Sequence, residues 1–345
     1  MKVRTLSCEV TARCAHRCYY CYNVWKEPDA GVGTGELAVG EWSALLARAV
    51  RDSGARHVTI TGGEPLARDD ALDLLAAAKG VVRSVSLITS GWRLLDAAAD
   101  IGRLGVSPVQ LTFLAAEREA HRVLKGLDSF DDLVEGAIRL REAGAEVHVC
   151  FVCTPRTFRR FGEVLELAVA LGIRRIAFNR ASPAGCGALD PGDVLPTVAQ
   201  VEEALEVGEW AAARHGLEIT TAMPIPRCVV DPSRFPHVRF ASCSSASDTP
   251  NPVIGPTGEV RLCNLSAEVL ADLRVDPWSK VEHAPYRRTF RESVPAECRS
   301  CRLRDRCGCG CREAARACRG GLDLLDPFVA QAVAANRPEV PGDVA

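Results

Sequence analysis

Sixteen cysteines among 345 residues are the side chains most able to do chemistry. The first group is Cys14-x3-Cys18-x2-Cys21, directly after a predicted strand. Thiolates two to three residues apart let one loop wrap an iron–sulfur cubane, with each sulfur on a different iron. Three thiols would leave the fourth iron open for an exogenous ligand. A zinc site completed by Cys8 or His16 is the alternative, and spacing alone does not separate the two.

A second group of cysteines lies in the C-terminal third of the chain. The pattern is Cys243-x14-Gly258-x4-Cys263, then Cys298-x2-Cys301-x5-Cys307-x3-Cys311, and finally Cys318. A zinc ribbon would need only four of these thiols. The sequence has no signal peptide and no apolar run long enough for a membrane span, so we expect a cytoplasmic protein. Clustered cysteines in that reducing compartment favour metal binding over disulfides.

The overall composition and charge of the chain limit the kinds of partner that it could bind. The chain is 47% hydrophobic and 25% charged, with a net charge of −2, which is typical of a globular protein. This charge balance gives no global basic field that would attract nucleic acid or an anionic membrane. We therefore expect neither as a partner.

Strand-like and helix-like segments alternate over the first 180 residues. Strands are predicted at 3–11, 57–61, 84–89, 109–113, 146–154 and 175–179, and helices at 39–52, 69–79, 92–104, 129–143 and 159–171. Such alternation predicts parallel βαβ units. Six units favour an α/β fold, a partial (β/α)6 TIM-like barrel, over a closed eightfold barrel.

After residue 180 strands and helices no longer alternate regularly, and one more amphipathic helix is predicted at 197–215. From about residue 224 the chain is loop-rich and cysteine-dense, so metal cross-links would supply stability that a small core cannot. We predict a barrel domain over 1–222, a cysteine-rich domain over 223–320, and a short helix with a tail over 321–345.

The run Thr61-Gly62-Gly63-Glu64-Pro65 ends the second predicted strand and by itself would be a tight turn into a helix. Together with the first cysteine motif, whose φ position holds Tyr20, it resembles the radical S-adenosylmethionine (SAM) superfamily with its C-x3-C-x-φ-C signature. The resemblance implies that Cys14, Cys18 and Cys21 hold a SAM-binding [4Fe–4S] cluster and that Tyr20 packs on the adenine. It also implies that the turn Gly62–Pro65 contacts the methionyl amino group through its carbonyls and carboxylate. Ser90, in Thr89-Ser90-Gly91, would contact the ribose.

The fourth predicted strand departs from the pattern of that family. Relatives often read Ser-Leu-Asp-Gly there, with a His and a Gly following, whereas this chain has Thr112-Phe113-Leu114-Ala115, then His121 and Gly126. The acidic residue is absent. We therefore expect a substrate pocket that differs from those of better-known members.

The C-terminal cysteine spacing resembles the SPASM domain, which carries auxiliary iron–sulfur clusters in many radical SAM enzymes. The resemblance assigns one cluster to Cys243, Cys263 and Cys311, and a second to Cys298, Cys301, Cys307 and Cys318. The first cluster then lacks a fourth ligand, for which Cys228 and Cys309 are the candidates, an open iron being the alternative. Gly258 is assigned to the fold, as a turn residue with positive φ.

The other cysteines divide into core and candidate site residues. Cys150 and Cys153 lie three apart on one predicted strand and so face opposite sides, and Cys8 is assigned to the core. Cys186 and Arg180 lie at the C-terminal edge of the sixth predicted strand, where barrel active sites form. They are the candidate catalytic residues, with Arg180 a candidate partner of the SAM carboxylate or of the substrate.

The resemblance implies an enzyme in which the reduced cluster cleaves SAM and the resulting 5′-deoxyadenosyl radical abstracts hydrogen from a substrate. Because SPASM enzymes act mostly on peptides, we expect oxidative modification or cross-linking of a ribosomally made precursor peptide. Only 13 residues precede Cys14, so we expect a separate leader-recognition protein, and a flavodoxin or ferredoxin as reductant. A dehydrogenase or epimerase acting on an aminocyclitol or sugar is the alternative. A simple electron carrier would have no use for Tyr20 or the Gly-Gly-Glu-Pro turn.

Overall fold

The computed structural model describes residues 3–23 and 35–335. Its strands form one sheet with the order β11-β10-β9-β1-β2-β3-β4-β5-β6-β7-β8. The strand bounds are β1 Thr5–Glu9, β2 His57–Thr61, β3 Ser84–Thr89, β4 Val109–Thr112, β5 Val147–Cys153, β6 Arg175–Arg180, β7 Glu218–Thr221, β8 Val238–Phe240, β9 Val253–Ile254, β10 Glu259–Arg261 and β11 Val269–Asp272.

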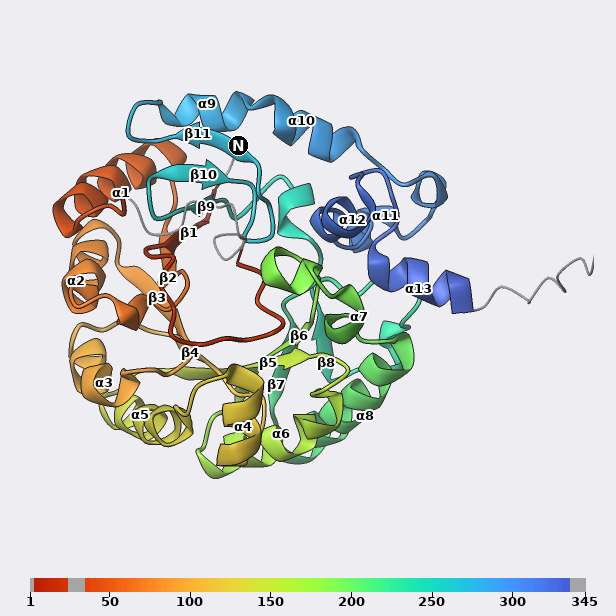
Figure 1. Cartoon of the computed structure of the whole chain (residues 1–345), viewed down its shortest axis with the longest axis horizontal. Helices are drawn as coiled ribbons and strands as arrows, with labels where there is room; N and C mark the ends of the chain where they lie inside the picture. Colours follow the sequence, from red (N-terminus) through yellow and green to blue (C-terminus); the bar gives the residue numbers. More distant parts are fainter. Residues whose placement is uncertain (1–2, 24–34, 336–345) are drawn as a thin grey trace, which may run out of the picture.

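Strands β1 to β8 pair in parallel, and helices surround them as an outer layer (Figure 1). The helix bounds are α1 Val39–Ser53, α2 Ala71–Val81, α3 Leu94–Arg103, α4 Arg118–Lys125, α5 Phe130–Glu142, α6 Phe161–Ala170, α7 Pro191–Val194, α8 Val198–His215, α9 Trp278–His283, α10 Pro285–Glu292, α11 Arg304–Cys307, α12 Arg312–Arg319 and α13 Pro327–Ala335. The predicted α/β fold and parallel barrel are confirmed. In the part of the chain described, no helix combines the length and apolarity that a membrane span needs.

Side chains along one strand separate into two environments. In β5, Val149, Phe151 and Cys153 pack into the core beneath the helices. Cys150 lies on the opposite face, toward Asn179 of β6, because successive strand residues alternate. The prediction that Cys150 and Cys153 face opposite sides is thus confirmed, and so is the burial of Cys8 in the core.

The barrel extends further than six strands. The short strands β7 and β8 continue the parallel order beyond β6. Four and three residues are too few to show a hydrophobic period, so the sequence gives no sign of them. At the other edge, β9 pairs in parallel with β1 and begins the antiparallel ribbon β9–β10–β11. The C-terminal cysteine segment is therefore joined to the barrel sheet itself.

Candidate active site

The loop after β1 carries Cys14, Cys18 and Cys21 across the end of the barrel, over the carboxyl ends of the strands (Figure 1). It rests on the Gly-Gly-Glu-Pro turn that follows β2. The backbone N–H of Gly63 donates to the Thr11 carbonyl at 2.8 Å, and that of Glu64 donates to the Arg13 carbonyl at 2.9 Å. A Cβ on Gly63 would lie 2.4 Å from the Arg13 carbonyl oxygen. Only glycine permits this approach of the two loops.

Glu64 links this turn to the end of β3. Its fully buried carboxylate accepts hydrogen bonds from Thr89 Oγ1 and the Ser90 N–H, both at 2.7 Å, and from the Leu66 N–H at 3.1 Å. Burial raises the pKa of Glu64, and these donors oppose the shift. The structure thus brings Glu64 and Ser90 together, as the resemblance expects of two neighbouring SAM contacts.

The second support of the cysteine loop is the C-terminal end of α4, a helix that the sequence did not reveal. The Arg17 N–H donates to the Lys125 carbonyl at 2.9 Å, and Cys18 Sγ lies 3.8 Å from the same oxygen. His16 Nε2 lies 3.0 Å from Ser129 Oγ. Gly126 ends α4 with φ +69, and a Cβ there would meet the Arg17 side chain at 2.8 Å. The absence of a side chain at Gly126 therefore permits the close contact between α4 and the loop.

The third support is the segment Gly185–Ala188. The Gly187 N–H donates to the Cys21 carbonyl at 3.0 Å, and a Cβ on Gly185 would lie 2.6 Å from the Asn23 carbonyl oxygen. The backbone of Cys186, a candidate catalytic residue, is thus next to the cysteine loop. Its side chain lies outside what the structure describes.

A polar cluster that sequence reasoning missed fixes the start of the loop. Glu36 accepts hydrogen bonds from Thr11 Oγ1 at 2.8 Å and from the Ala12 N–H at 2.9 Å. The buried Arg68 donates to the Val10 carbonyl at 3.0 Å and pairs with Asp70 at 2.7 Å. Glu36 lies far from Arg68 and Asp70 in the chain and none of the three belongs to a motif, so no spacing signals their role.

Tyr20, on the three-cysteine loop, faces the end of β4. Its ring meets Tyr19 edge-on at 5.3 Å and packs against Leu114 and Ala115 at the end of β4. Burial, and then the neighbouring Cys18, raise the pKa of Tyr20 well above its usual range. The residues that replace the usual Ser-Leu-Asp-Gly motif therefore form an apolar wall behind Tyr20.

Beside this wall lie buried polar groups from α4, β5 and β6. Lys125 and His121 are each only 1% exposed, and neither ring nitrogen of His121 has a hydrogen-bond partner among the residues that the structure describes. Burial lowers the pKa of His121 to about 3, and the nearby Lys125 ammonium adds to the shift. Asn179 Nδ2 donates to Cys150 Sγ at 3.2 Å, and the charge of Lys125 also acts on this thiol. A buried cation thus lies close to the three-cysteine loop.

The C-terminal cysteines form two groups. Cys263 is close to Cys311 and Cys243, the two other thiols that the resemblance assigns to the first auxiliary cluster. Burial raises the pKa of Cys263, and Glu313 and these two thiols add to the shift. Glu9 of β1 holds the same region: it pairs with the buried Arg261 and accepts from Asn264 Nδ2 at 3.0 Å. Gly258 has φ +93, as predicted.

The second group contains Cys298 and Cys307, together with two thiols that the resemblance does not place there. Burial raises the pKa of Cys298 to about 12, with further contributions from Cys309, its hydrogen-bond partner, then Cys307 and Cys228. Cys228 in turn is close to Cys307 and Cys301. Cys228 therefore lies near thiols of the second group.

Cys318 lies in α12 and is partly exposed. Burial and then the nearby Asp326 raise its pKa, and no other cysteine contributes. Within residues 3–23 and 35–335, no three Cys, His, Asp or Glu side chains converge on a point suited to a single metal ion.

Arg180 lies in a buried link between the barrel and the C-terminal helix. It is fully buried, ion-paired with the buried Asp326, and donates from Nε to the Pro224 carbonyl at 2.8 Å. Asp326 also accepts from the Cys311 N–H at 2.7 Å and from the Phe328 N–H, just inside α13, at 2.9 Å. The structure thus gives Arg180 partners that belong to the fold.

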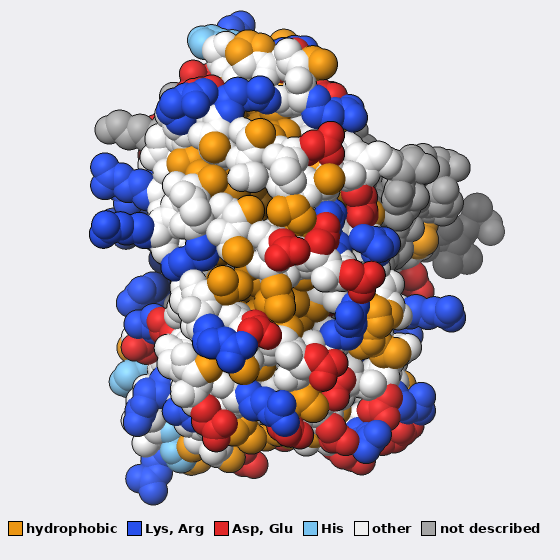
Figure 2. Space-filling model, turned by 90° about the vertical axis from the view of Figure 1, so that its left-hand side faces the viewer, with side chains coloured by type: hydrophobic (Ala, Val, Ile, Leu, Met, Phe, Trp, Pro, Cys, Tyr) orange, Lys and Arg blue, Asp and Glu red, His pale blue; other side chains and the backbone are white. Residues whose placement is uncertain are grey.

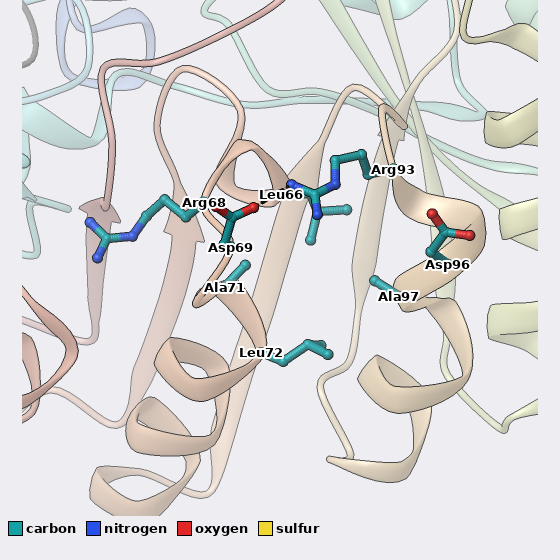
Figure 3. Close-up of a pocket in the computed structure, with 8 residues that line it drawn as sticks. All are labelled: Leu66, Arg68, Asp69, Ala71, Leu72, Arg93, Asp96 and Ala97. Carbon is teal, nitrogen blue, oxygen red and sulfur yellow. Dashed lines mark hydrogen bonds and ion pairs between the residues drawn. The ribbon is translucent and has the colours of Figure 1, made fainter.

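A small pocket of about 140 Å³ lies elsewhere, between the N-terminal ends of α2 and α3 (Figure 3). An ion pair of Arg93 with Asp69, at 2.9 Å, crosses it, while the Arg68 side chain extends away from Arg93. Its lining comes from the segment 66–72 after β2 and from Arg93, Asp96 and Ala97 at the start of α3. None of the three cysteines of the loop lines it, so we do not assign it to the site that they form.

A parallel α/β barrel with a three-cysteine loop over its strand ends is the arrangement of a class of radical enzymes. Similarity to known proteins leads to the same class. A family model described as the Radical SAM superfamily matches residues 8–174. A protein from Streptomyces rochei named PqqA peptide cyclase is 30% identical over 334 residues, which cover 92% of this chain and 87% of that protein. The chain therefore belongs to the radical SAM superfamily, and its cofactors are a [4Fe–4S] cluster and SAM.

Two solved structures share the fold. Streptococcus suis SuiB bound to its precursor peptide SuiA has a TM-score of 0.73 at 15% identity, covering 96% of this chain and 76% of SuiB. Native anSMEcpe with bound AdoMet has a TM-score of 0.72 at 16% identity, covering 96% of this chain and 95% of that protein. The likeness extends through the cysteine-rich segment as well as the barrel.

Proposed function

We propose that this enzyme is a cytoplasmic peptide maturase that oxidatively modifies or cross-links a ribosomally made precursor peptide. The observation that carries the proposal is similarity along nearly the whole chain. Four relatives named PqqA peptide cyclase are 28–30% identical over 92–94% of this chain. This span includes the C-terminal cysteines as well as the barrel.

The three-cysteine loop suits a [4Fe–4S] cluster. Thiolates are the preferred ligands of such clusters, and Cys14, Cys18 and Cys21 are all partly exposed on a loop held at three points. The bound, reduced cluster supplies the electron that splits SAM into methionine and a 5′-deoxyadenosyl radical. The task of the chain is then to hold the target C–H bond at a near-attack distance of ~3–3.5 Å and to exclude water.

Around SAM, we assign contacts to Tyr20, the backbone of Gly62–Pro65, and Ser90. Because Glu64 is buried and holds the Ser90 N–H, it acts as a positioning residue for the ribose contact. The buried ammonium of Lys125 is suited to a carboxylate, either that of SAM or one of the peptide, since a buried charge requires a partner.

The C-terminal groups suit two auxiliary clusters, which would take up the electron that the substrate radical loses and would relay electrons from an external reductant to the cluster of the first loop. We assign the first to Cys243, Cys263 and Cys311. We assign the second to Cys298, Cys301 and Cys307, with Cys228, Cys309 or Cys318 as fourth ligand. The proximity of Cys228 to Cys301 and Cys307 favours Cys228.

The test is anaerobic reconstitution followed by two measurements. Iron analysis should give about twelve iron atoms per chain, as three cubanes require. Addition of SAM, dithionite and a peptide encoded beside the gene should give 5′-deoxyadenosine and a peptide that has lost hydrogen, both seen by mass spectrometry. 5′-Deoxyadenosine with an unchanged peptide, but with oxidation of an aminocyclitol or sugar, would favour the small-molecule alternative. A peptide that reacts only when a leader-recognition protein is added would identify that partner.

A further inference from the structure

The segment that carries the second cysteine group is strongly basic. Residues 285–307 contain seven arginines and three acidic residues, a net charge of +4 in a chain whose total is −2. The rest of the chain therefore carries −6. The local field of this segment is opposite in sign to that of the remaining molecule.

Three arginines of this segment have no ion-pair partner among the described residues, whereas Arg291 pairs with Asp248 at 3.4 Å. Arg299, Arg302 and Arg306 are exposed, and none of them forms an ion pair with a described residue. Arg304 pairs only with the adjacent Asp305, at 3.4 Å. We call Arg299, Arg302, Arg304 and Arg306 the arginine surface.

Charges are arranged differently on the face over α1, α2 and α3. There acidic and basic side chains are interspersed (Figure 2), and some exposed arginines have acidic partners, as in Arg51–Asp52 and Arg103–Asp100. A solvated surface normally has this mixed character. An accumulation of one sign is instead the arrangement that steers a charged partner.

The arginine surface alternates in sequence with the cysteines of the second group. Cys298, Cys301 and Cys307 are each partly exposed, and Arg299, Arg302 and Arg306 immediately follow or precede them. A redox group held by these thiols would be bound by residues directly adjacent to these arginines in the chain. A docked protein would therefore reach it over a short path.

We propose that the arginine surface is the docking site of a small acidic electron-carrier protein. The carrier is oxidised by one electron and the group held by the second cysteines is reduced by one, with no bond or proton exchanged. This inference rests on the proposed function, which places an auxiliary cluster there. Steering by opposite charge raises association rates by about 10- to 1000-fold at low salt, and the effect is lost when salt screens it.

The test measures binding of a purified acidic flavodoxin to the iron-loaded enzyme at 50 and 300 mM salt. The variant is Arg299→Glu/Arg302→Glu/Arg306→Glu. Its matched control is Arg51→Glu/Arg56→Glu/Arg83→Glu, which makes the same charge change at exposed sites by the amino ends of β2 and β3. We expect Kd for the wild type to rise with salt. At low salt, the first variant should bind at least about tenfold more weakly and the control like the wild type.

A second readout separates docking from chemistry. 5′-Deoxyadenosine formation driven by flavodoxin should fall in the first variant, while formation driven by dithionite should not. Equal binding by both variants would overturn the proposal, as would a loss confined to precursor-peptide binding. If dithionite gave no 5′-deoxyadenosine with the wild type while flavodoxin binding behaved as expected, the docking site would stand and the proposed function would fail.

Discussion

The loop after β1 and the C-terminal segment both present cysteines, but they are held by different means. The first loop has its three thiols within eight residues, and backbone hydrogen bonds from three separate elements fix it. The C-terminal thiols are drawn from residues 228 to 318, and buried side-chain pairs such as Glu9–Arg261 and Arg180–Asp326 hold their segments. Backbone support tolerates changes of side chain, whereas a buried ion pair does not tolerate the loss of one partner. The first site should thus depend on its glycines, and the second on its ion pairs.

The largest expected effect is at the thiols of the first loop. Cys14→Ala, Cys18→Ala or Cys21→Ala should abolish 5′-deoxyadenosine formation, because two thiols do not hold a SAM-binding cubane. Iron should fall by about four atoms per chain, with the C-terminal clusters retained. Cys8→Ala is the control, since Cys8 is buried in the core of the neighbouring strand. Retained SAM cleavage in any of the three variants would refute the ligand assignment.

Glycine substitutions test the claim that the first loop depends on backbone contact. In Gly63→Ala the new Cβ would lie 2.4 Å from the Arg13 carbonyl oxygen, so the cysteine loop must move. We expect loss of most iron at the first site and at least about a hundredfold slower SAM cleavage.

The matched control is Gly80→Ala, where a Cβ in α2 would meet nothing within 4 Å. That variant should retain activity and gain about 0.5–1 kcal/mol in free energy of unfolding, because alanine is the better helix former. Similar losses in the two variants would mean that the contact at Gly63 has no special importance.

The position of the Gly-Gly-Glu-Pro turn at the end of β2 could be predicted, because strand β2 has the bounds that its pattern indicates. The three-cysteine loop follows from local spacing in the same way. The pairing of Arg180 with Asp326 could not be predicted, since these residues are 146 positions apart and neither belongs to a motif. The proximity of Cys228 to Cys301 and Cys307 could not be predicted for the same reason. Spacing orders cysteines along the chain, whereas the fold decides which thiols meet.

A pH-dependent contribution to stability is expected from His121. Its folded-state pKa is lowered to about 3, so below pH 6.5 the unfolded chain binds a proton that the folded chain does not. Stability from this group is full above pH 6.5 and is lost as the pH falls. In His121→Phe, which keeps an aromatic ring between Phe113 and Phe130, the loss between pH 6.5 and 5 should be smaller by about 2 kcal/mol. Denaturant unfolding at both pH values measures it, and equal losses would contradict the burial of a neutral ring.

The smallest expected effect is at Cys309. Substitutions there show whether Cys309 is a cluster ligand or a strained residue with no ligand role. Its φ of +64 is unfavourable for a residue with a Cβ, and it lies between Gly308 and Gly310, which share that conformation. Cys309→Gly should relieve about 1 kcal/mol of strain in the iron-free chain. Cys309→Ala keeps the strain but removes the thiol.

The iron content of these two variants then decides the role of Cys309. If Cys228 completes the second cluster, both variants should retain about twelve iron atoms, whereas Cys228→Ala should lose iron. If Cys309 is the ligand, both should lose iron in spite of the relieved strain in Cys309→Gly. The hydrogen bond between Cys309 and Cys298 would then belong to the cluster-free chain only, and the backbone strain would be the cost of placing a thiol between two glycines.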